Sequence, residues 1–207
     1  MSALILDNFL QFPKLVREWA INQEYYTSKQ FTEMYEKYTD WPGKRTKHVV
    51  ELDKDYADNT LTSVANIARS FFGLRDISIR SYFQLTTVED GDSWVHQDNN
   101  VKLAGILYLN PDASVNSGTT LYKCTNKEKW ESFMNSQEGY STLKTINRLE
   151  NRDLYAELFT PLDIIGNVFN RLVMYPGDVY HKSNDYFGHD NQTGRLTQVF
   201  FINEGDD

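Results

Sequence analysis

In the first third of the chain, apolar residues recur at the three-to-four-residue spacing of helices that bury one face. Two segments follow this period and are predicted as helices, residues 13–22 and 60–72, and a more polar helix is predicted over residues 29–38. Pro13 suits the first position of a helix, and Gly73 suits the position just past a helix end. A short opening strand and turn over residues 4–10 and a short strand over residues 49–52 complete this part.

From residue 77 onward, the pattern changes to the alternation that is typical of strands. Residues 77–85 alternate between apolar and polar side chains, whereas residues 102–110 form a nearly continuous apolar run, as in a strand covered on both faces. Further short strands are predicted over residues 94–98, 119–123, 170–175, 179–182 and 195–202. Many short strands with Gly- and Pro-containing turns, preceded by helices, predict an α+β protein built as a β-sandwich or a jelly roll.

Residues 125–160 interrupt the series of strands. Thr125 and Glu128 form a capping-box pattern, which predicts a helix that ends near Asn135, and a second helix is predicted over residues 142–151. A block of this length is too short to build its own core, so we interpret it as a helical insertion. The chain is therefore predicted to be one domain, residues 1–207, with the following parts: N-terminal helical support over 1–76, a jelly-roll core over 77–202 and the insertion over 125–160.

The composition narrows the kind of protein. A net charge of −8, from 21 basic and 29 acidic residues, gives no general attraction to nucleic acid or to anionic membrane surfaces. The single cysteine, Cys124, excludes an internal disulfide and fits a reducing compartment. No basic leader precedes the first apolar run, and no apolar stretch approaches the roughly 20 residues of a membrane span. We expect a cytoplasmic protein without a clear nucleic-acid or membrane partner, and the oligomeric state stays open.

His96 and Asp98 are the first candidates for chemistry. They stand two residues apart in a segment that is predicted as a strand or its end, so both side chains point to the same face. Such a pair is frequent by chance and needs a third ligand to become a metal site. Of the other histidines, His181 is the best choice because it follows a tight turn and lies within a predicted strand, whereas His189 lies in a polar loop and His48 lies among basic residues.

Two histidines and one carboxylate on strands would form a facial triad. Such a triad leaves three of the six octahedral positions open, which is what non-haem Fe(II) needs to bind a cosubstrate and O₂ together. A closed structural zinc site would need four protein ligands and usually cysteines, which this chain does not supply. The sequence therefore favours an open iron site over a structural zinc site.

A candidate receptor for a carboxylate lies on the last predicted strand. Arg195 opens this strand and Thr197 follows two residues later, so both side chains lie on the same face. A guanidinium binds a carboxylate through two parallel hydrogen bonds, and the neighbouring hydroxyl adds a donor. Tyr108, on a neighbouring predicted strand, adds a phenolic donor. Each residue taken alone is more often a surface arginine or a core tyrosine, but the combination in this order suits a dicarboxylate whose other end chelates iron.

Taken together, these residues resemble the Fe(II)/2-oxoglutarate-dependent dioxygenase superfamily, and its prolyl-hydroxylase-like branch in particular. The resemblance covers residues 77–202 and rests on the following elements in order: His96-x-Asp98, a strand that ends in Tyr108-Leu109-Asn110, His181, and Arg195 with Thr197 two residues later. It implies a double-stranded β-helix (jelly roll) in which His96, Asp98 and His181 bind Fe(II). Arg195, Tyr108 and Thr197 would hold the distal carboxylate of 2-oxoglutarate, and Tyr82 would face the cosubstrate or the substrate.

The activity that the resemblance implies is hydroxylation of an unactivated C–H bond with 2-oxoglutarate and O₂, with ascorbate as a reductant of the iron. The branch favours a protein or peptide residue such as proline as the substrate, with a free amino acid or another small molecule as the alternative. Two other classes stay open: a non-catalytic jelly-roll module that binds a metal or another ligand, and a zinc hydrolase on the same fold. Departures from the family pattern, such as Ser117-Gly118 in place of Gly-Gly and the long insertion, affect the rim of the site and leave the substrate open.

Overall fold

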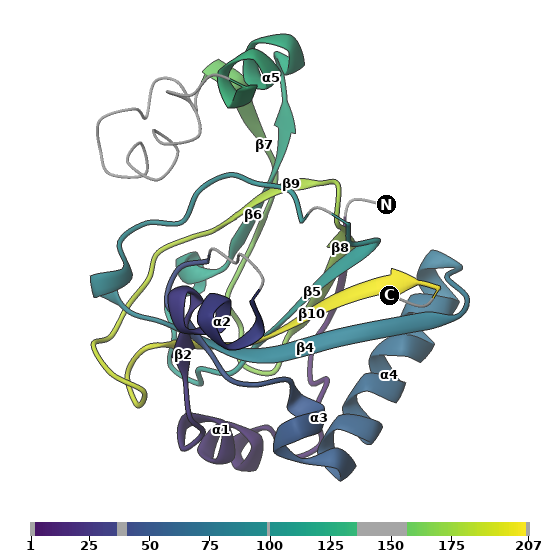
Figure 1. The fold of residues 1–207 in the computed structure, drawn as a ribbon, viewed down its shortest axis with the longest axis vertical. Coiled ribbons are helices and arrows are strands. Elements are labelled where there is room, and N and C mark those ends of the chain that lie inside the picture. The colour runs from purple at the N-terminus through teal and green to yellow at the C-terminus, as the bar shows by residue number, and fades with distance from the viewer. Residues whose placement is uncertain (1–2, 37–40, 99, 136–156, 206–207) are drawn as a thin grey trace.

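The computed structural model describes residues 3–36, 41–98, 100–135 and 157–205, and within these ranges the chain forms two antiparallel sheets (Figure 1). The large sheet has seven strands in the order β1 (Leu4–Leu6), β8 (Leu172–Pro176), β5 (Leu103–Tyr108), β10 (Arg195–Glu204), β4 (Ile77–Thr86), β3 (Lys44–Arg45) and β2 (Tyr26–Thr27). The small sheet has three strands in the order β7 (Phe159–Ile165), β6 (Thr119–Cys124) and β9 (Tyr180–Ser183). This arrangement is an α+β, jelly-roll-like fold.

Five α-helices accompany the sheets in the described part of the chain: α1 (Pro13–Ile21), α2 (Ser28–Tyr35), α3 (Val49–Leu52), α4 (Lys54–Phe72) and α5 (Lys127–Asn135). Helices α1, α3 and α4 lie together on one side of the large sheet (Figure 1). They contribute Ala20, Val49 and Val64 to a hydrophobic cluster with Phe83 and Phe200 of the sheet. No helix among the described residues is long and apolar enough to cross a membrane.

Strand β5 shows how the two cores are separated. All six of its residues are buried, as its continuous apolar run predicts. Leu103 and Leu107 belong to the cluster beneath the helices, whereas Ala104, Ile106 and Tyr108 pack with residues of the small sheet in a second cluster. Successive side chains of a strand point to opposite faces, so this single strand closes the helical core on one side and the space between the two sheets on the other.

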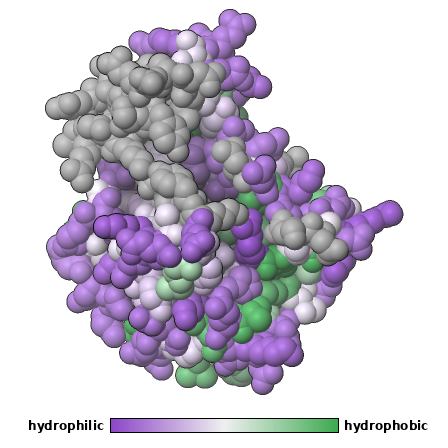
Figure 2. All heavy atoms as spheres, viewed as in Figure 1, coloured by the Kyte–Doolittle hydropathy of each residue, from purple (hydrophilic) through white to green (hydrophobic). Residues whose placement is uncertain are grey.

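Hydrophobic side chains therefore lie mainly inside the protein. The view in Figure 2 shows a largely hydrophilic face on which apolar side chains gather in a limited area. Exceptions include Leu162 and Ile164 of the edge strand β7 and Leu15 of α1, which are exposed.

Several predicted boundaries need correction. Residues 49–52 form helix α3 and not a strand, because the His48 ring accepts a hydrogen bond from the Val50 amide at 3.1 Å and caps the turn. Helix α4 begins at Lys54, six residues before the predicted start, because the Asp53 carboxylate caps the Tyr56 amide at 2.9 Å. Residues 94–98 form no extended strand and pair only through one isolated bridge at His96.

The part predicted as N-terminal support also contributes strands β1, β2 and β3 to the large sheet, of which β2 and β3 were not predicted. The predicted helical insertion contains α5, but strand β7 begins at Phe159, within its last residues. The second helix predicted in this block, over residues 142–151, lies outside the described residues.

Candidate metal centre and cavity

A pair of backbone hydrogen bonds places the two candidate histidines side by side. The His96 amide donates to the His181 carbonyl at 3.0 Å, and the His181 amide donates to the His96 carbonyl at 2.8 Å. This antiparallel bridge brings the two ring centroids to 4.3 Å. The Asp98 amide donates to the carbonyl of Gly177, in the turn between β8 and β9, at 2.9 Å. The turn that precedes His181 in the sequence thus also positions Asp98.

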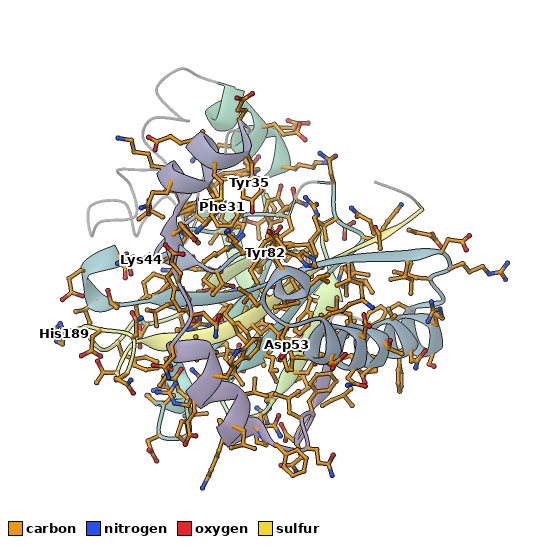
Figure 3. All side chains as sticks on the ribbon, turned by 60° about the horizontal axis from the view of Figure 1, so that its bottom comes forward. Phe31, Tyr35, Lys44, Asp53, Tyr82 and His189 are labelled. Carbon is orange, nitrogen blue, oxygen red and sulfur yellow. The ribbon has the colours of Figure 1, made fainter. Side chains whose placement is uncertain are left out.

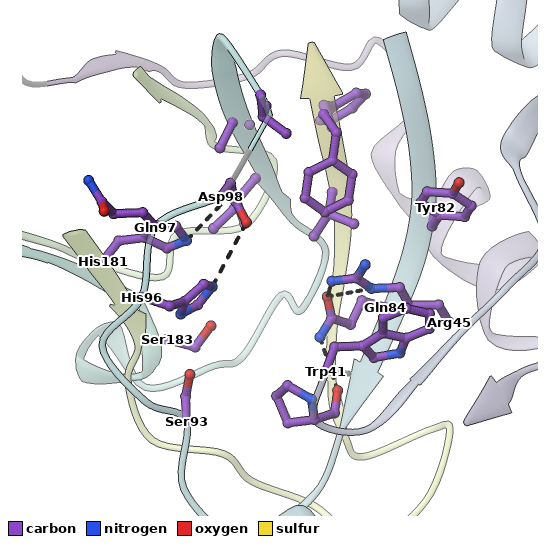
Figure 4. A pocket seen from close by; sticks show the side chains of 18 of the residues that line it. Trp41, Arg45, Tyr82, Gln84, Ser93, His96, Gln97, Asp98, His181 and Ser183 are labelled. Atoms are coloured by element: carbon purple, nitrogen blue, oxygen red, sulfur yellow. Dashed lines mark hydrogen bonds and ion pairs between the residues drawn. The ribbon is translucent and has the colours of Figure 1, made fainter. Parts of the chain in front are cut away.

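The side chains of His96, Asp98 and His181 converge (Figure 4). Asp98 Oδ2 lies 3.5 Å from His181 Nε2, and Asp98 Oδ1 lies 3.9 Å from His96 Nε2. One ligand atom from each residue lies within 4.8 Å of the other two, and this is the one such group of three found in the described part of the chain. The three residues that the sequence singles out as metal ligands are therefore close enough to share one ion.

The hydrogen bonds of the other ring nitrogens determine the tautomer of both histidines. His96 Nδ1 lies 2.9 Å from the Trp94 carbonyl, and His181 Nδ1 lies 3.0 Å from the Val179 carbonyl. A carbonyl oxygen only accepts, so each Nδ1 has to carry the proton. Each Nε2, which faces Asp98, is then the ring nitrogen that is available to bind a metal. This arrangement of an Nδ1–H donor and a free Nε2 is the usual preparation of a histidine for metal binding.

The partly buried environment of His96 favours the neutral ring, which is the form that binds a metal. Desolvation is the main cause that lowers the pKa of His96, to about 4, and the neighbouring His181 and Arg45 lower it further while Asp98 opposes the shift. A neutral imidazole is required for coordination. His96 is therefore neutral and able to coordinate at neutral pH without first losing a proton.

The triad lies on the wall of a cavity of about 930 Å³. Tyr82, Gln84, Arg45 and Trp41 lie across from the triad in the close-up (Figure 4), and Tyr82 is the residue that the resemblance places near the cosubstrate or substrate. Phe31 and Tyr35 of α2 approach Tyr82 of β4, with ring centroids of Phe31 and Tyr82 5.9 Å apart (Figure 3). Trp130 of α5 also lines the cavity. The predicted insertion thus contributes to the cavity wall.

The predicted carboxylate receptor also comes together in the structure. Thr197 lies opposite Tyr108 in the register of β10 and β5, and the Arg195 guanidinium lies 5.6 Å from the centre of the Tyr108 ring. Arg195 is buried and donates to the carbonyls of Ser117 at 2.9 Å and Gly118 at 3.3 Å. The described residues provide no carboxylate partner for it.

Arg195, Tyr108 and Thr197 are not among the described residues that line the cavity. Two tyrosines that the sequence did not single out, Tyr175 and Tyr186, line it in the neighbourhood of Arg195. Burial is the main cause that raises the pKa of each tyrosine, and the charge of Arg195 lowers both. The Tyr175 ring centroid lies 4.9 Å from that of His181, so Tyr175 borders both the triad and the Arg195 group.

Other cavity residues also escaped the sequence prediction. Arg45 and Gln84 face each other across strands β3 and β4, and β3 is too short to show a periodic pattern. The sequence does carry a signal for Tyr175 as a cavity residue, because it continues the alternation of the predicted strand just before the turn that leads to His181. Nothing in the local sequence around Arg45 distinguishes it from its basic neighbours Lys44 and Lys47.

The fold is shared with solved oxygenase structures. HygX from Streptomyces hygroscopicus, with nickel and 2-oxoglutarate bound, is 10% identical, with a TM-score of 0.60 over 98% of this chain and 83% of that chain. A Pseudomonas putida prolyl-4-hydroxylase is 14% identical, with a TM-score of 0.50 over 99% and 94%. The non-haem α-ketoglutarate-dependent epimerase SnoN from nogalamycin biosynthesis is 10% identical, with a TM-score of 0.51 over 98% and 78%. At these identities the similarity establishes the fold alone.

The family of the chain follows from its sequence. No curated protein matches this chain. The model of one protein family, described as "Family of unknown function (DUF6445)", matches residues 1–202. This match spans nearly the entire sequence, and we conclude that the chain, with its oxygenase-like fold, belongs to this family.

Proposed function

We propose that the protein is an Fe(II)- and 2-oxoglutarate-dependent oxygenase that hydroxylates an unactivated C–H bond. The observation that carries the proposal is the convergence of two histidine Nε2 atoms and one carboxylate on the wall of a large cavity. The oxygenase-like fold supports it, because HygX and SnoN have been solved with 2-oxoglutarate or α-ketoglutarate. On this proposal, the two sheets form the double-stranded β-helix of one domain that spans the chain.

The donor set fits Fe(II). Two neutral imidazoles and one carboxylate occupy three positions of an octahedron and leave three for exogenous ligands. His96, Asp98 and His181 would hold the ion, and their backbone hydrogen bonds keep both rings oriented without help from the metal. Both rings and the carboxylate border the cavity, so the open positions would face the space that a cosubstrate and a substrate need.

The environment of Arg195 fits the distal carboxylate of 2-oxoglutarate. Its buried charge has no carboxylate partner among the described residues, and an anion that replaced part of its contacts with backbone carbonyls would gain a charge-assisted hydrogen bond. Tyr108 and Thr197 place two hydroxyl groups beside it. Tyr175 and Tyr186 border the route from the triad to Arg195, so we infer that a tyrosine side chain shifts when the cosubstrate binds.

The chemistry supplied by the bound iron, 2-oxoglutarate and O₂ is the oxidation of 2-oxoglutarate to succinate and CO₂, coupled to the insertion of one oxygen atom into a C–H bond. The chain has three tasks in this reaction. The triad fixes the metal, Arg195 with its hydroxyl neighbours orients the cosubstrate, and the aromatic wall around Tyr82 positions the substrate and excludes water. Our first choice of substrate is a peptide residue such as proline, and the alternative is a free amino acid or another small molecule.

The solved relatives support both substrate classes. One of them is a prolyl-4-hydroxylase, whereas HygX has been solved with hygromycin B bound. The size of the cavity suits a small molecule as well as a side chain of a peptide.

The proposal is tested by metal titration and turnover. Anaerobic Fe(II) titration should show one site per chain, and 2-oxoglutarate should be converted to succinate with Fe(II), O₂ and ascorbate. His96→Ala should lose both, whereas the control His189→Ala should lose neither, because His189 is exposed and pairs with Glu89 in a loop. Unchanged ligand binding in His96→Ala would favour a non-catalytic binding module, and turnover with zinc and without O₂ would favour a hydrolase.

A further inference from the structure

A second arginine, Arg45, has no function in the proposal above, although it lines the same cavity. Its Nε and Nη2 atoms donate to Gln84 Oε1 at 3.2 and 3.1 Å. The Gln84 side-chain nitrogen donates in turn to the Pro42 carbonyl at 3.1 Å, which fixes the amide with its oxygen toward Arg45. The guanidinium also stacks on aromatic rings, 4.4 Å from the Trp41 ring centre and 5.1 Å from that of Phe201. Arg45 is therefore held rigidly.

The positive charge of Arg45 is only partly offset, by the carboxylate of Asp98 across the cavity. No carboxylate of the described residues forms an ion pair with it, and its Nη1 atom has no hydrogen-bond partner among them. Burial lowers the pKa of Arg45 to about 10, so the group stays charged at neutral pH. A charge that is removed from water without a partner is costly, and the cost is relieved when an anion binds. Arg45 therefore favours an anion in the cavity.

Binding of the proposed iron and 2-oxoglutarate would not remove the excess positive charge of the cavity. Fe(II) and 2-oxoglutarate carry equal and opposite charges, and Asp98 supplies one negative charge against the two arginines, Arg45 and Arg195. Of the other charged residues that line the cavity, Glu51 and Arg80 offset each other. One positive charge is left for the substrate, and Arg45 is the one of these two arginines that lines the cavity.

The surroundings of Arg45 describe the rest of the ligand. Phe31, Tyr35 and Tyr82 line the cavity beside it, so the wall is mainly aromatic and suits an apolar body. The Trp41 Nε1–H is buried and has no hydrogen-bond partner among the described residues. A buried donor without an acceptor is rare, and this one belongs to the ring on which the Arg45 guanidinium stacks.

We propose that Arg45 binds the carboxylate of the substrate, and that the substrate is a small organic acid with an apolar or aromatic body. This inference rests on the proposed oxygenase function. Of the two substrate classes named there, it selects the small molecule in place of the peptide residue. An internal peptide segment would offer only neutral carbonyls and would leave the charge of Arg45 unbalanced. In this arrangement, Arg45 and the triad hold opposite ends of the substrate and so determine which C–H bond faces the metal.

The test uses two probes that differ only in charge, 3-phenylpropanoate and 3-phenylpropanamide. Their binding to the full chain is measured by calorimetry with Ni(II) and 2-oxoglutarate present, so that no turnover occurs. A hydrogen bond to a charged group contributes about 1.5–3 kcal/mol, so the acid should bind about 10- to 100-fold more tightly than the amide. Arg45→Met should abolish this preference, and Arg45→Lys should retain part of it.

Separate measurement of 2-oxoglutarate binding distinguishes the two proposals. Arg45→Met should keep the affinity for 2-oxoglutarate, whereas Arg195→Met should lose it. If the wild-type chain does not bind 2-oxoglutarate, the oxygenase proposal fails, and a preference for the acid in the metal-free chain would still support the role of Arg45. Equal binding of the two probes by the wild type, no binding of either, or loss of 2-oxoglutarate binding in Arg45→Met would overturn the inference.

Discussion

Gly177 should control the geometry of the metal site although it carries no side chain. A Cβ atom at this position would lie 2.2 Å from the Val101 carbonyl oxygen and 3.2 Å from that of Asp98. Real Cβ contacts essentially never fall below 3.0 Å, so the two backbones would have to separate by about 0.8 Å. We predict that Gly177→Ala moves Asp98 away from His181.

The size of the effect follows from the hydrogen bonds across this contact. The Asp98 amide donates to the Gly177 carbonyl at 2.9 Å, and the Gly177 amide donates to the Lys102 carbonyl at 3.0 Å. A separation of about 0.8 Å takes both beyond hydrogen-bond distance, at a cost of about 1 kcal/mol each. We expect the melting temperature to fall by about 4–8 °C. We expect Fe(II) affinity to fall by about 10- to 100-fold, as when a group that orients a metal ligand is lost.

The matched control is Gly73→Ala. Gly73 ends helix α4 with a φ of +72°, and a Cβ there would meet nothing within 4 Å. The left-handed conformation costs about 1–2 kcal/mol for a residue with a side chain, so stability should fall by a similar amount without a change at the metal site. Anaerobic Fe(II) titration and thermal melting of both variants decide the matter. Fe(II) affinity within twofold of the wild type in Gly177→Ala would refute the reasoning.

Three further outcomes follow from the structure. Tyr108→Phe removes the 2.8 Å hydrogen bond to Thr119 Oγ1 between buried groups. The free energy of unfolding in urea should fall by about 1–2 kcal/mol, and 2-oxoglutarate should bind more weakly. Unchanged values for both would contradict the role of the hydroxyl. The hydrogen bond to Glu89 raises the pKa of His189, so Glu89→Gln should lower that pKa toward its ordinary 6.5 in an NMR titration. The stabilisation from this pair should be present at low pH and fade as the pH rises through the raised pKa. Equal titration midpoints of His189 in both proteins would exclude this effect of Glu89. Phe200 lies in the core beneath the helices, so Phe200→Ala should lower the free energy of unfolding by about 3–5 kcal/mol in the same assay. A loss below 1 kcal/mol would show that neighbouring side chains repack into the cavity.

The candidate metal ligands could be predicted from the sequence because their arrangement is largely local. His96 and Asp98 stand two residues apart, and His181 follows a turn that the sequence marks with Pro176 and Gly177. The continuous apolar run of β5 likewise reports that both of its faces are covered. These features depend on spacing over a few residues, which the chain carries in any context.

Other parts of the site depend on contacts between distant segments. Arg45 reaches the cavity because a two-residue strand pairs with β4, and its position is then held by Gln84, 39 residues further along. Residues 49–52 were predicted as a strand, but they form a helical turn in which the His48 ring accepts the capping hydrogen bond from the Val50 amide. Tyr175 of β8 and Tyr186, in the loop after β9, both lie near Arg195 at the start of β10, and this proximity depends on the tertiary arrangement.

The sequence by itself thus determined the kind of fold and the identity of the three candidate metal ligands. The tertiary structure decided that Arg195, Tyr108 and Thr197 lie behind the cavity wall and that a second arginine faces the triad. The physical reason is that period and spacing encode which face of an element a side chain occupies, whereas the neighbours of that face are set by long-range strand pairing and sheet packing.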